Sequence, residues 1–277
     1  MQLDIKPASD YPVTDLFRFL NLSFENYLIP IQFNINQFLG MLRKDGIDLN
    51  TSRVLLVDDE PSGTALIARR GWTSRLAAMG VMKEARGKKA GSWLMEQLIK
   101  EARARNDREM TLEVIEQNEP AVRLYKRSNF QTIRRLIGFA ENEKSPNTVR
   151  PASHLQEMDL REMGRLILQH GLPDLPWQFS GETIALLNPP ARAYRNGQAY
   201  IAISDPTTEN VVIWSLLVET AARGQGLAAE MLQDVMVTFP NKQWHVPAIL
   251  PEELGFVFER AGFQREELSQ WQMRLML

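Results

Sequence analysis

The chain lacks cysteine altogether, and histidine is scarce. Without cysteine, disulfides, thiolate metal ligands and cysteine nucleophiles are all excluded. The three histidines are His154, His170 and His245, and they are scattered without the close spacing typical of metal ligands. We therefore expect a protein that holds no metal.

Neither sign of charge prevails, and long apolar runs are missing. The sequence has 32 Lys and Arg against 34 Asp and Glu, a formal net charge of -2, which argues against a general basic face for long nucleic acid. No stretch approaches about 18 uninterrupted apolar residues, so we expect no membrane span. The N-terminal segment MQLDIKPASD has no basic flank followed by an apolar core and does not resemble a signal peptide. These features predict a cytoplasmic protein without nucleic-acid or membrane partners.

The sequence contains three pairs of similar segments in the same order. They are residues 5–9 and 149–153, 81–91 and 218–228, and 125–130 and 258–263. The offsets are 149 − 5 = 144, 223 − 86 = 137 and 263 − 130 = 133. Offsets that drift slowly in one direction indicate a duplication with trimmed loops. We predict two domains, 1–141 and 148–277, separated by a polar stretch at 141–147.

Both copies have the pattern of a mixed α/β domain. In the first copy we expect helices at 11–27, 33–44, 89–105 and 120–127, and strands at 53–57, 64–69, 110–115 and 130–138. The hairpin arms of the second copy are expected at 199–203 and 211–218. The helix at 89–105 has one apolar stripe that predicts a buried face. The stripe consists of Leu94, Met95, Leu98, Ile99 and Ala102.

A basic, glycine-containing loop precedes that helix and reads Glu84-Ala85-Arg86-Gly87-Lys88-Lys89-Ala90-Gly91. The free N–H groups and partial positive charge of a helix N-terminus suit a pyrophosphate, and glycine lets the backbone approach its oxygens. Lys83 adds a further basic side chain. The second copy has Arg223-Gly224-Gln225-Gly226-Leu227-Ala228 at the same junction. The glycine spacing fits neither a Walker loop nor a dinucleotide fingerprint.

Together with segments farther along the chain, these loops resemble the GNAT superfamily of N-acetyltransferases. The family signature is Arg/Gln-x-x-Gly-x-Gly/Ala, then Leu-x-Val, Asn-x-x-Ala-x-x-Leu-Tyr and a Gly-Phe or similar pair. The first copy matches the later part with Leu112-Glu113-Val114, Asn118, Ala121, Leu124-Tyr125 and Asn129-Phe130, although Lys89 stands where the family has glycine. The second copy keeps the loop as Arg223, Gly226 and Ala228 but has Pro251, Leu254 and Phe258 where the family has Asn, Ala and Tyr.

The resemblance implies an α/β fold of the α+β type, with two tandem acyl-CoA N-acyltransferase-like domains. Each domain would be a mixed, mostly antiparallel sheet flanked by helices. The implied reaction is a direct attack of a primary amine on acetyl-CoA, with no metal. The acceptor would be a small-molecule or peptide amine, while the oligomeric state stays open.

The same resemblance implies roles for particular residues. Tyr125 would be the general acid, and Glu113, which faces away from Leu112 and Val114 by strand alternation, would be the base. Asn118 would contact the pantetheine arm, although an ordinary helix cap explains it equally well. The backbone at Gly80, Val81 and Met82 would pair with pantetheine and supply an oxyanion donor. The remaining cofactor contacts would come from Arg86, Gly87, Lys88, Lys89, Ala90 and Gly91.

Two alternative functions remain open, and one of them depends on the second copy. A second candidate cofactor site consists of Val218, Arg223, Gly224, Gln225, Gly226, Leu227 and Ala228. Phe258 lacks the hydroxyl of Tyr125, which favours a degenerate second copy. The alternatives are catalysis in the C-terminal copy and a non-catalytic module that binds acyl-CoA.

Overall fold

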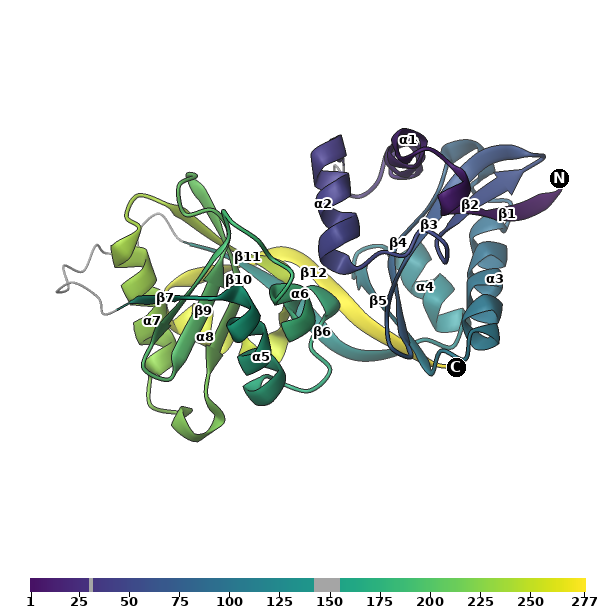
Figure 1. Ribbon diagram of the computed structural model, residues 1–277. Helices are drawn as coiled ribbons and strands as arrows, with labels where there is room; N and C mark the ends of the chain where they lie inside the picture. The colour runs from purple at the N-terminus through teal and green to yellow at the C-terminus, as the bar shows by residue number, and fades with distance from the viewer. Residues whose placement is uncertain (30–31, 142–154) are drawn as a thin grey trace. The chain divides into compact units, whose positions relative to one another are not determined.

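The computed structural model of the protein describes residues 1–29, 32–141 and 155–277 (Figure 1). The chain divides into two compact units, the first made of Met1–Ile133 with Trp271–Leu277 and the second of Arg134–Gln270. The repeated segment expected at 149–153 and residues 142–147 of the expected polar stretch lie outside the described residues.

Within its described residues, the first unit contains one sheet and four α-helices. Its strands are β1 (Leu3–Pro7), β2 (Arg53–Val57), β3 (Glu60–Arg70), β4 (Thr73–Val81), β5 (Glu109–Ile115) and the end of β12 (Phe263–Met276), in that spatial order. Its helices are α1 (Val13–Ser23), α2 (Ile35–Asp45), α3 (Ala90–Ala104) and α4 (Glu119–Arg127). The helices and the hairpin therefore lie where the sequence pattern predicts them.

The second unit repeats this architecture. Its sheet order is β12, β6 (Gln131–Glu141), β11 (Gln243–Pro251), β10 (Asn210–Val218), β9 (Ala199–Ile203), β8 (Arg192–Asn196) and β7 (Gln156–Met158). Its helices are α5 (Leu160–His170), α6 (Gly181–Ile184), α7 (Leu227–Thr238) and α8 (Phe256–Arg260).

Helices cover both faces of each sheet (Figure 1). In the first unit, α3 and α4 pack on a core that holds the predicted stripe of Leu94, Met95, Leu98, Ile99 and Ala102. Helices α1 and α2 pack on a separate core on the opposite face. The second unit has the same division, with α7 and α8 on one core and α5 and α6 on the other.

Each sheet is mostly antiparallel and contains one pair of parallel strands that separate along their length. In the first unit, β4 and β5 pair only over residues 73–76 and 109–112. In the second unit, β10 and β11 pair only over residues 210–212 and 243–245. Beyond these residues each pair leaves strand edges whose backbone groups can bind another molecule. The predicted mixed, mostly antiparallel sheet with helices on its faces is confirmed in both units.

The prediction that the strand at 130–138 closes the first unit is wrong. Strand β6 instead pairs with β11, and its residues Ile137 and Phe139 lie in the core of the second unit. The end of β12 fills the vacated place, with Met273 and Leu275 buried in the core of the first unit. The units therefore differ from the predicted domains 1–141 and 148–277. Residues 134–141 belong to the second unit, and residues 271–277 belong to the first. Local sequence pattern could not reveal this exchange, because both segments have the alternation of ordinary strands.

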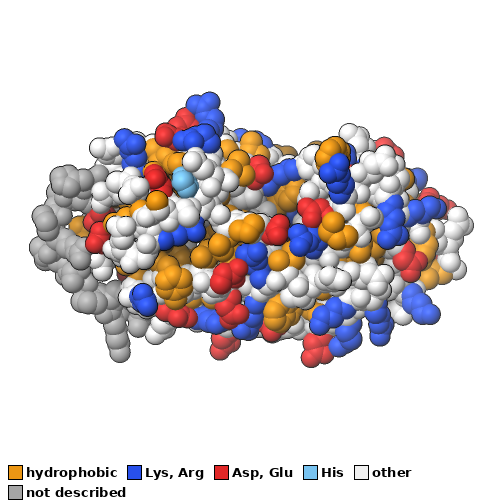
Figure 2. All heavy atoms as spheres, turned by 90° about the horizontal axis from the view of Figure 1, so that it is seen from below, with side chains coloured by type: hydrophobic (Ala, Val, Ile, Leu, Met, Phe, Trp, Pro, Cys, Tyr) orange, Lys and Arg blue, Asp and Glu red, His pale blue; other side chains and the backbone are white. Residues whose placement is uncertain are grey.

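Charged side chains of both signs are interspersed on the face shown in Figure 2. Neither sign of charge dominates that face. Within the described residues, none of the helices has the length and apolar character needed to cross a bilayer.

Candidate acyl-transfer site

The basic loop before α3 forms one wall of a pocket of about 390 Å³ in the first unit. Gly87 and Lys89 have positive φ angles of 76° and 63°, which turn the chain sharply into the helix. Lys89 is the N-cap residue of α3, and its side chain does not cap the first turn. Of the predicted loop residues, Arg86, Gly87, Lys89, Ala90 and Gly91 line the pocket, whereas Lys88 does not.

Arg86 is held by backbone carbonyls rather than directed at the pocket. Its Nε donates to the Val81 oxygen at 2.8 Å, and its Nη2 donates to the oxygens of Ser23 and Glu25 at 3.0 Å each. The arginine therefore joins the end of α1 to the end of β4. Its guanidinium thus positions the loop instead of offering free charge to a phosphate.

Helix α4 supplies the basic side chains that the sequence analysis did not select. Arg123 and Arg127 line the pocket together with Pro120 and Leu124, one helical turn apart on a single face. Arg123 forms an exposed ion pair with Glu119 at 2.8 Å. The i, i+4 spacing of the two arginines was visible in the sequence and could have identified them.

The edge of β4 next to β5 offers free backbone groups. Met82 donates its N–H to Ser62 on β3 at 2.8 Å. Because alternate residues of a strand direct their N–H groups to opposite edges, the Val81 N–H faces the open edge and that of Gly80 faces β3. A Cβ atom on Gly80 would lie 2.6 Å from Ser23 Cβ, so glycine is needed there to let α1 approach. Of the three predicted backbone donors, Val81 is thus the one placed at the opening.

Asn118 caps the N-terminus of α4 and contacts Tyr27, while Tyr125 lies near the C-terminal end of the same helix, on the side facing the core. The Asn118 Oδ1 accepts from the Ala121 N–H at 3.3 Å, and its Nδ2 donates to the Tyr27 hydroxyl at 2.9 Å. Burial raises the pKa of Tyr125, and the neighbouring Tyr27 raises it further, so the Tyr125 hydroxyl keeps its proton at neutral pH. Tyr125 packs edge-on against Phe130 with ring centroids 5.9 Å apart. Sequence reasoning missed Tyr27, because 91 residues separate it from Asn118.

Glu113 lies in a buried ion network. Its Oε2 is 2.7 Å from the Nε of Arg75, and the Nη1 of Arg75 is 3.5 Å from Oδ2 of Asp45. The side chains of Arg75 and Glu113 are 3% and 5% exposed. The Glu113 Oε1 has no hydrogen-bond partner among the described residues and is itself enclosed. A base must reach its proton directly or through one water, and Glu113 does not line the pocket at the basic loop.

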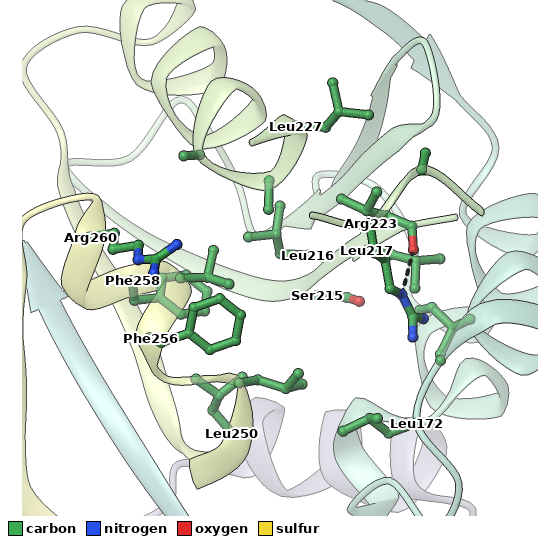
Figure 3. A pocket seen from close by; sticks show the side chains of 18 of the residues that line it. Leu172, Ser215, Leu216, Leu217, Arg223, Leu227, Leu250, Phe256, Phe258 and Arg260 are labelled. Atoms are coloured by element: carbon green, nitrogen blue, oxygen red, sulfur yellow. Dashed lines mark hydrogen bonds between the residues drawn. The ribbon is translucent and has the colours of Figure 1, made fainter. Parts of the chain in front are cut away.

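The corresponding loop of the second unit lines a pocket of about 420 Å³ (Figure 3). Arg223 repeats the arrangement of Arg86: its Nε donates to the Val218 oxygen at 3.3 Å and its Nη2 to the oxygen of His170 at the end of α5. Gly226, with φ of 86°, is the N-cap of α7 and corresponds to Lys89. All the predicted residues of this second site line the pocket except Gln225.

Phe258 occupies the position that Tyr125 has in the first unit. It packs edge-on against Phe263 with centroids 5.6 Å apart, as Tyr125 packs against Phe130. The aromatic packing is conserved between the units while the hydroxyl is not. Within the described residues, no group of three or more His, Asp or Glu side chains is arranged to hold a metal ion.

Comparison with known proteins agrees with this geometry. Residues 15–130 match the model of the acetyltransferase (GNAT) family. No curated protein sequence is significantly similar to the chain. Solved structures similar in fold include a GCN5-related N-acetyltransferase from Sphaerobacter thermophilus, with a TM-score of 0.70, 14% identity, and coverage of 99% of this chain and 95% of the other.

Two further structures share the fold over nearly the whole chain. A tandem GNAT protein from the clavulanic acid biosynthesis pathway has a TM-score of 0.66 and 15% identity, with 99% of this chain and 98% of the other covered. A GCN5-related N-acetyltransferase from Anabaena variabilis has the same score and identity, with 98% and 72% covered. Residues 15–130 therefore match the GNAT acetyltransferase family, within a chain whose fold is similar to that of a tandem GNAT protein.

Proposed function

We propose that the protein is an acetyl-CoA-dependent N-acetyltransferase whose working site is in the first unit. The observation that carries the proposal is the continuity of α4. This one helix turns Arg123 and Arg127 toward the basic pocket and Tyr125, which lies between them in sequence, toward the opposite side, while Asn118 caps its N-terminus. A cofactor with phosphates at one end and a thioester at the other matches that distribution of charge and proton donors.

The residues around the pocket fit the phosphate end of coenzyme A. The uncapped first turn of α3 offers N–H groups, and Lys89, Arg123 and Arg127 surround it with positive charge. Arg86 keeps the loop in place through the carbonyls that it binds. Acetyl-CoA would supply an activated acetyl group as a thioester. The Val81 N–H, on the open edge of β4, is placed to donate to an oxygen that gains negative charge.

Two side chains are proposed to donate a hydrogen bond and to accept a proton in the reaction. Tyr125 Oη holds its proton at neutral pH and donates a hydrogen bond to developing negative charge. Its raised pKa makes complete proton transfer to a thiolate unfavourable, since an ordinary thiol has a pKa of about 8.5. Glu113 would accept the amine proton at Oε1 while Arg75 holds Oε2. The acceptor is proposed to be a primary amine of a small molecule or a peptide.

A thiol-release assay with acetyl-CoA and a panel of amines tests the proposal. The panel should include aminoglycosides, polyamines, amino acids and peptide N-termini. We expect amine-dependent release of thiol by the wild-type protein and strongly reduced release by Tyr125→Phe. Release that survives this change but is lost in Arg223→Glu would assign catalysis to the second unit. Failure of every amine, with acetyl-CoA still bound, would favour a non-catalytic acyl-CoA-binding module.

A further inference from the structure

The turn between β3 and β4 exposes a tryptophan at one end of the first unit. Trp72 is 59% exposed, whereas tryptophan is usually largely buried in folded proteins. The turn precedes Thr73, the first residue of β4, and the basic loop follows Val81, the last. At the rise of a β-strand the two ends of β4 lie ~25 Å apart. The tryptophan is therefore remote from the pocket at the basic loop.

An arginine covers one face of the exposed indole. Strands β4 and β5 begin their pairing at Thr73 and Glu109, so the preceding residues lie side by side. The Arg108 N–H donates to the Trp72 oxygen at 2.7 Å, and the Arg108 Cζ lies 3.3 Å from the centroid of the ring. The exposed area of Trp72 is therefore on the other face and the edges of the ring. A stacked guanidinium keeps its N–H groups at its own edge, where they can bind an anion.

The second unit forms the same backbone contact without either side chain. There the Gln243 N–H donates to the Glu209 oxygen at 2.9 Å, at the start of the parallel pair β10 and β11. Neither of these residues is aromatic or basic. The fold of the unit therefore does not require the stacked pair of Trp72 and Arg108, which indicates that the pair serves in binding.

A buried carboxylate holds two more arginines at this end of the unit. The Asp107 Oδ1 accepts from Nη2 of Arg69, and its Oδ2 accepts from Nη2 of Arg105, at 2.9 Å each. The arginine side chains remain 31% and 21% exposed. One negative charge compensates only one of the two guanidiniums. Because Asp107 already orders both side chains, they lose little conformational entropy when they bind a ligand.

Further arginines add to the positive charge at this end. Arg70 precedes the turn, and the exposed Arg103 lies in the last turn of α3. The neighbouring carboxylate of Glu109 is 3.6 Å from Arg274. The expectation that the protein has no nucleic-acid partner rests on the formal net charge of -2, which is an average over the chain and does not exclude a local basic surface. The Trp72 surface consists of Arg69, Arg70, Trp72, Arg103, Arg105 and Arg108.

We propose that the Trp72 surface binds single-stranded nucleic acid. One base would stack on the open face of the Trp72 indole, while the neighbouring phosphates would bind the arginines around it. Stacking on a side chain needs an unpaired base, so a duplex fits this surface less well. An acidic polypeptide would satisfy the charge but leave the exposed indole without a partner. Strands of DNA and RNA share the bases and phosphates that this surface recognises.

Fluorescence anisotropy of a labelled octanucleotide, titrated with the full-length chain, tests the proposal. One strand has a mixed sequence, and a second is abasic but carries the same phosphates. We expect the mixed strand to bind at low salt and to weaken with salt, with a log–log slope of about −2 to −3 for three or four phosphate contacts. Unlabelled duplex and polyglutamate should compete less well than the unlabelled mixed strand. Absence of binding at low salt, or equal competition by polyglutamate, would overturn the proposal.

Matched substitutions assign the binding to this surface. Trp72→Ala should weaken binding of the mixed strand by about 5- to 150-fold, as expected for one stacked base, and leave the abasic strand unaffected. Trp72→Phe should restore part of the loss, whereas Arg108→Ala should weaken both strands.

Arg18→Ala is the control for net charge. Arg18 is also exposed and lies over an aromatic ring, 5.4 Å from the centroid of Phe19, but it belongs to α1. Its replacement should leave both strands unaffected. An equal loss for the mixed and abasic strands in Trp72→Ala would contradict stacking on the indole. A loss in Arg18→Ala as large as in Arg108→Ala would contradict a site at the Trp72 surface.

Discussion

Lys89 and Gly226 adopt the same left-handed backbone conformation at the N-cap positions of α3 and α7, with φ angles of 63° and 86°. The conformation is therefore a property of the loop and not of the residue. Glycine adopts it at little cost, whereas lysine is strained by its Cβ atom. The first unit retains the strained residue where it also adds positive charge to the pocket.

Replacing Lys89 with glycine should increase the free energy of unfolding by ~1 kcal/mol, because relief of the left-handed strain exceeds the added freedom of the unfolded chain. Urea denaturation would measure the change. The matched control is Lys88→Gly, whose residue does not have a positive φ and which should lose stability instead. Equal effects of the two substitutions would contradict the prediction. Acetyl-CoA affinity should fall in Lys89→Gly despite the gain in stability.

Arg127→Ala should weaken acetyl-CoA binding by about two- to fivefold, the range expected for an exposed ionic contact. The neighbouring Lys126→Ala removes the same charge but does not line the pocket, so it should leave affinity unchanged. Calorimetry at low and high salt would separate the two, since the difference should shrink as salt screens the contact. A loss of the same size in both variants would mean that only net charge matters.

Tyr125→Phe should lower kcat while leaving acetyl-CoA affinity nearly unchanged, because it removes a proton donor and keeps the ring that packs on Phe130. General acid catalysis is worth up to about 10²–10⁴-fold. The raised pKa of Tyr125 places the expected loss toward the lower end of that range. Steady-state rates of thiol release would measure it. An unchanged kcat would remove Tyr125 from the mechanism.

The raised pKa of Tyr125 also predicts a loss of stability at alkaline pH. The folded protein holds the phenol proton more tightly than the unfolded chain, in which tyrosine has a pKa of about 10. The contribution is complete below pH ~10 and decreases as pH rises above it, because the unfolded state then gains by ionising. The free energy of unfolding, measured by denaturation between pH 8 and 11, is expected to fall less steeply with pH for Tyr125→Phe than for the wild type. Parallel curves would contradict this assignment.

Glu113→Gln should affect both stability and catalysis. The substitution removes one partner of the buried ion pair with Arg75 and should lower the free energy of unfolding by up to ~3 kcal/mol. Asp45 still pairs with Arg75 and limits the loss. If Glu113 is the base, kcat should also fall most at low pH, where the amine carries a proton. Glu109→Gln, on the same strand but in a more exposed pair, should cost less than ~1 kcal/mol. Lost stability with an unchanged pH profile of kcat would leave Glu113 a purely structural role.

The sequence by itself determined the local elements and the family signature of this protein. The apolar stripe of α3, the hairpin arms and the motif from Leu112 to Tyr125 are encoded by residues close together in the chain. Periodicity and short spacing are sufficient to identify such features. The turn itself is shorter than the expected 58–63: only Asp58 and Asp59 lie between β2 and β3, and both have positive φ, which short polar side chains tolerate.

Only the tertiary structure decided which segments complete each sheet and which charges are free. The exchange of β6 and the end of β12 depends on pairing between residues more than 100 positions apart, since Ile137 pairs with Leu250. The same holds for Arg86 and Glu113, which the sequence presents as free ionic groups. Folding gives Arg86 three carbonyl partners and Glu113 an arginine partner. Long-range contacts of this kind leave no local pattern, because the energy of a charged group depends on whatever folding brings beside it.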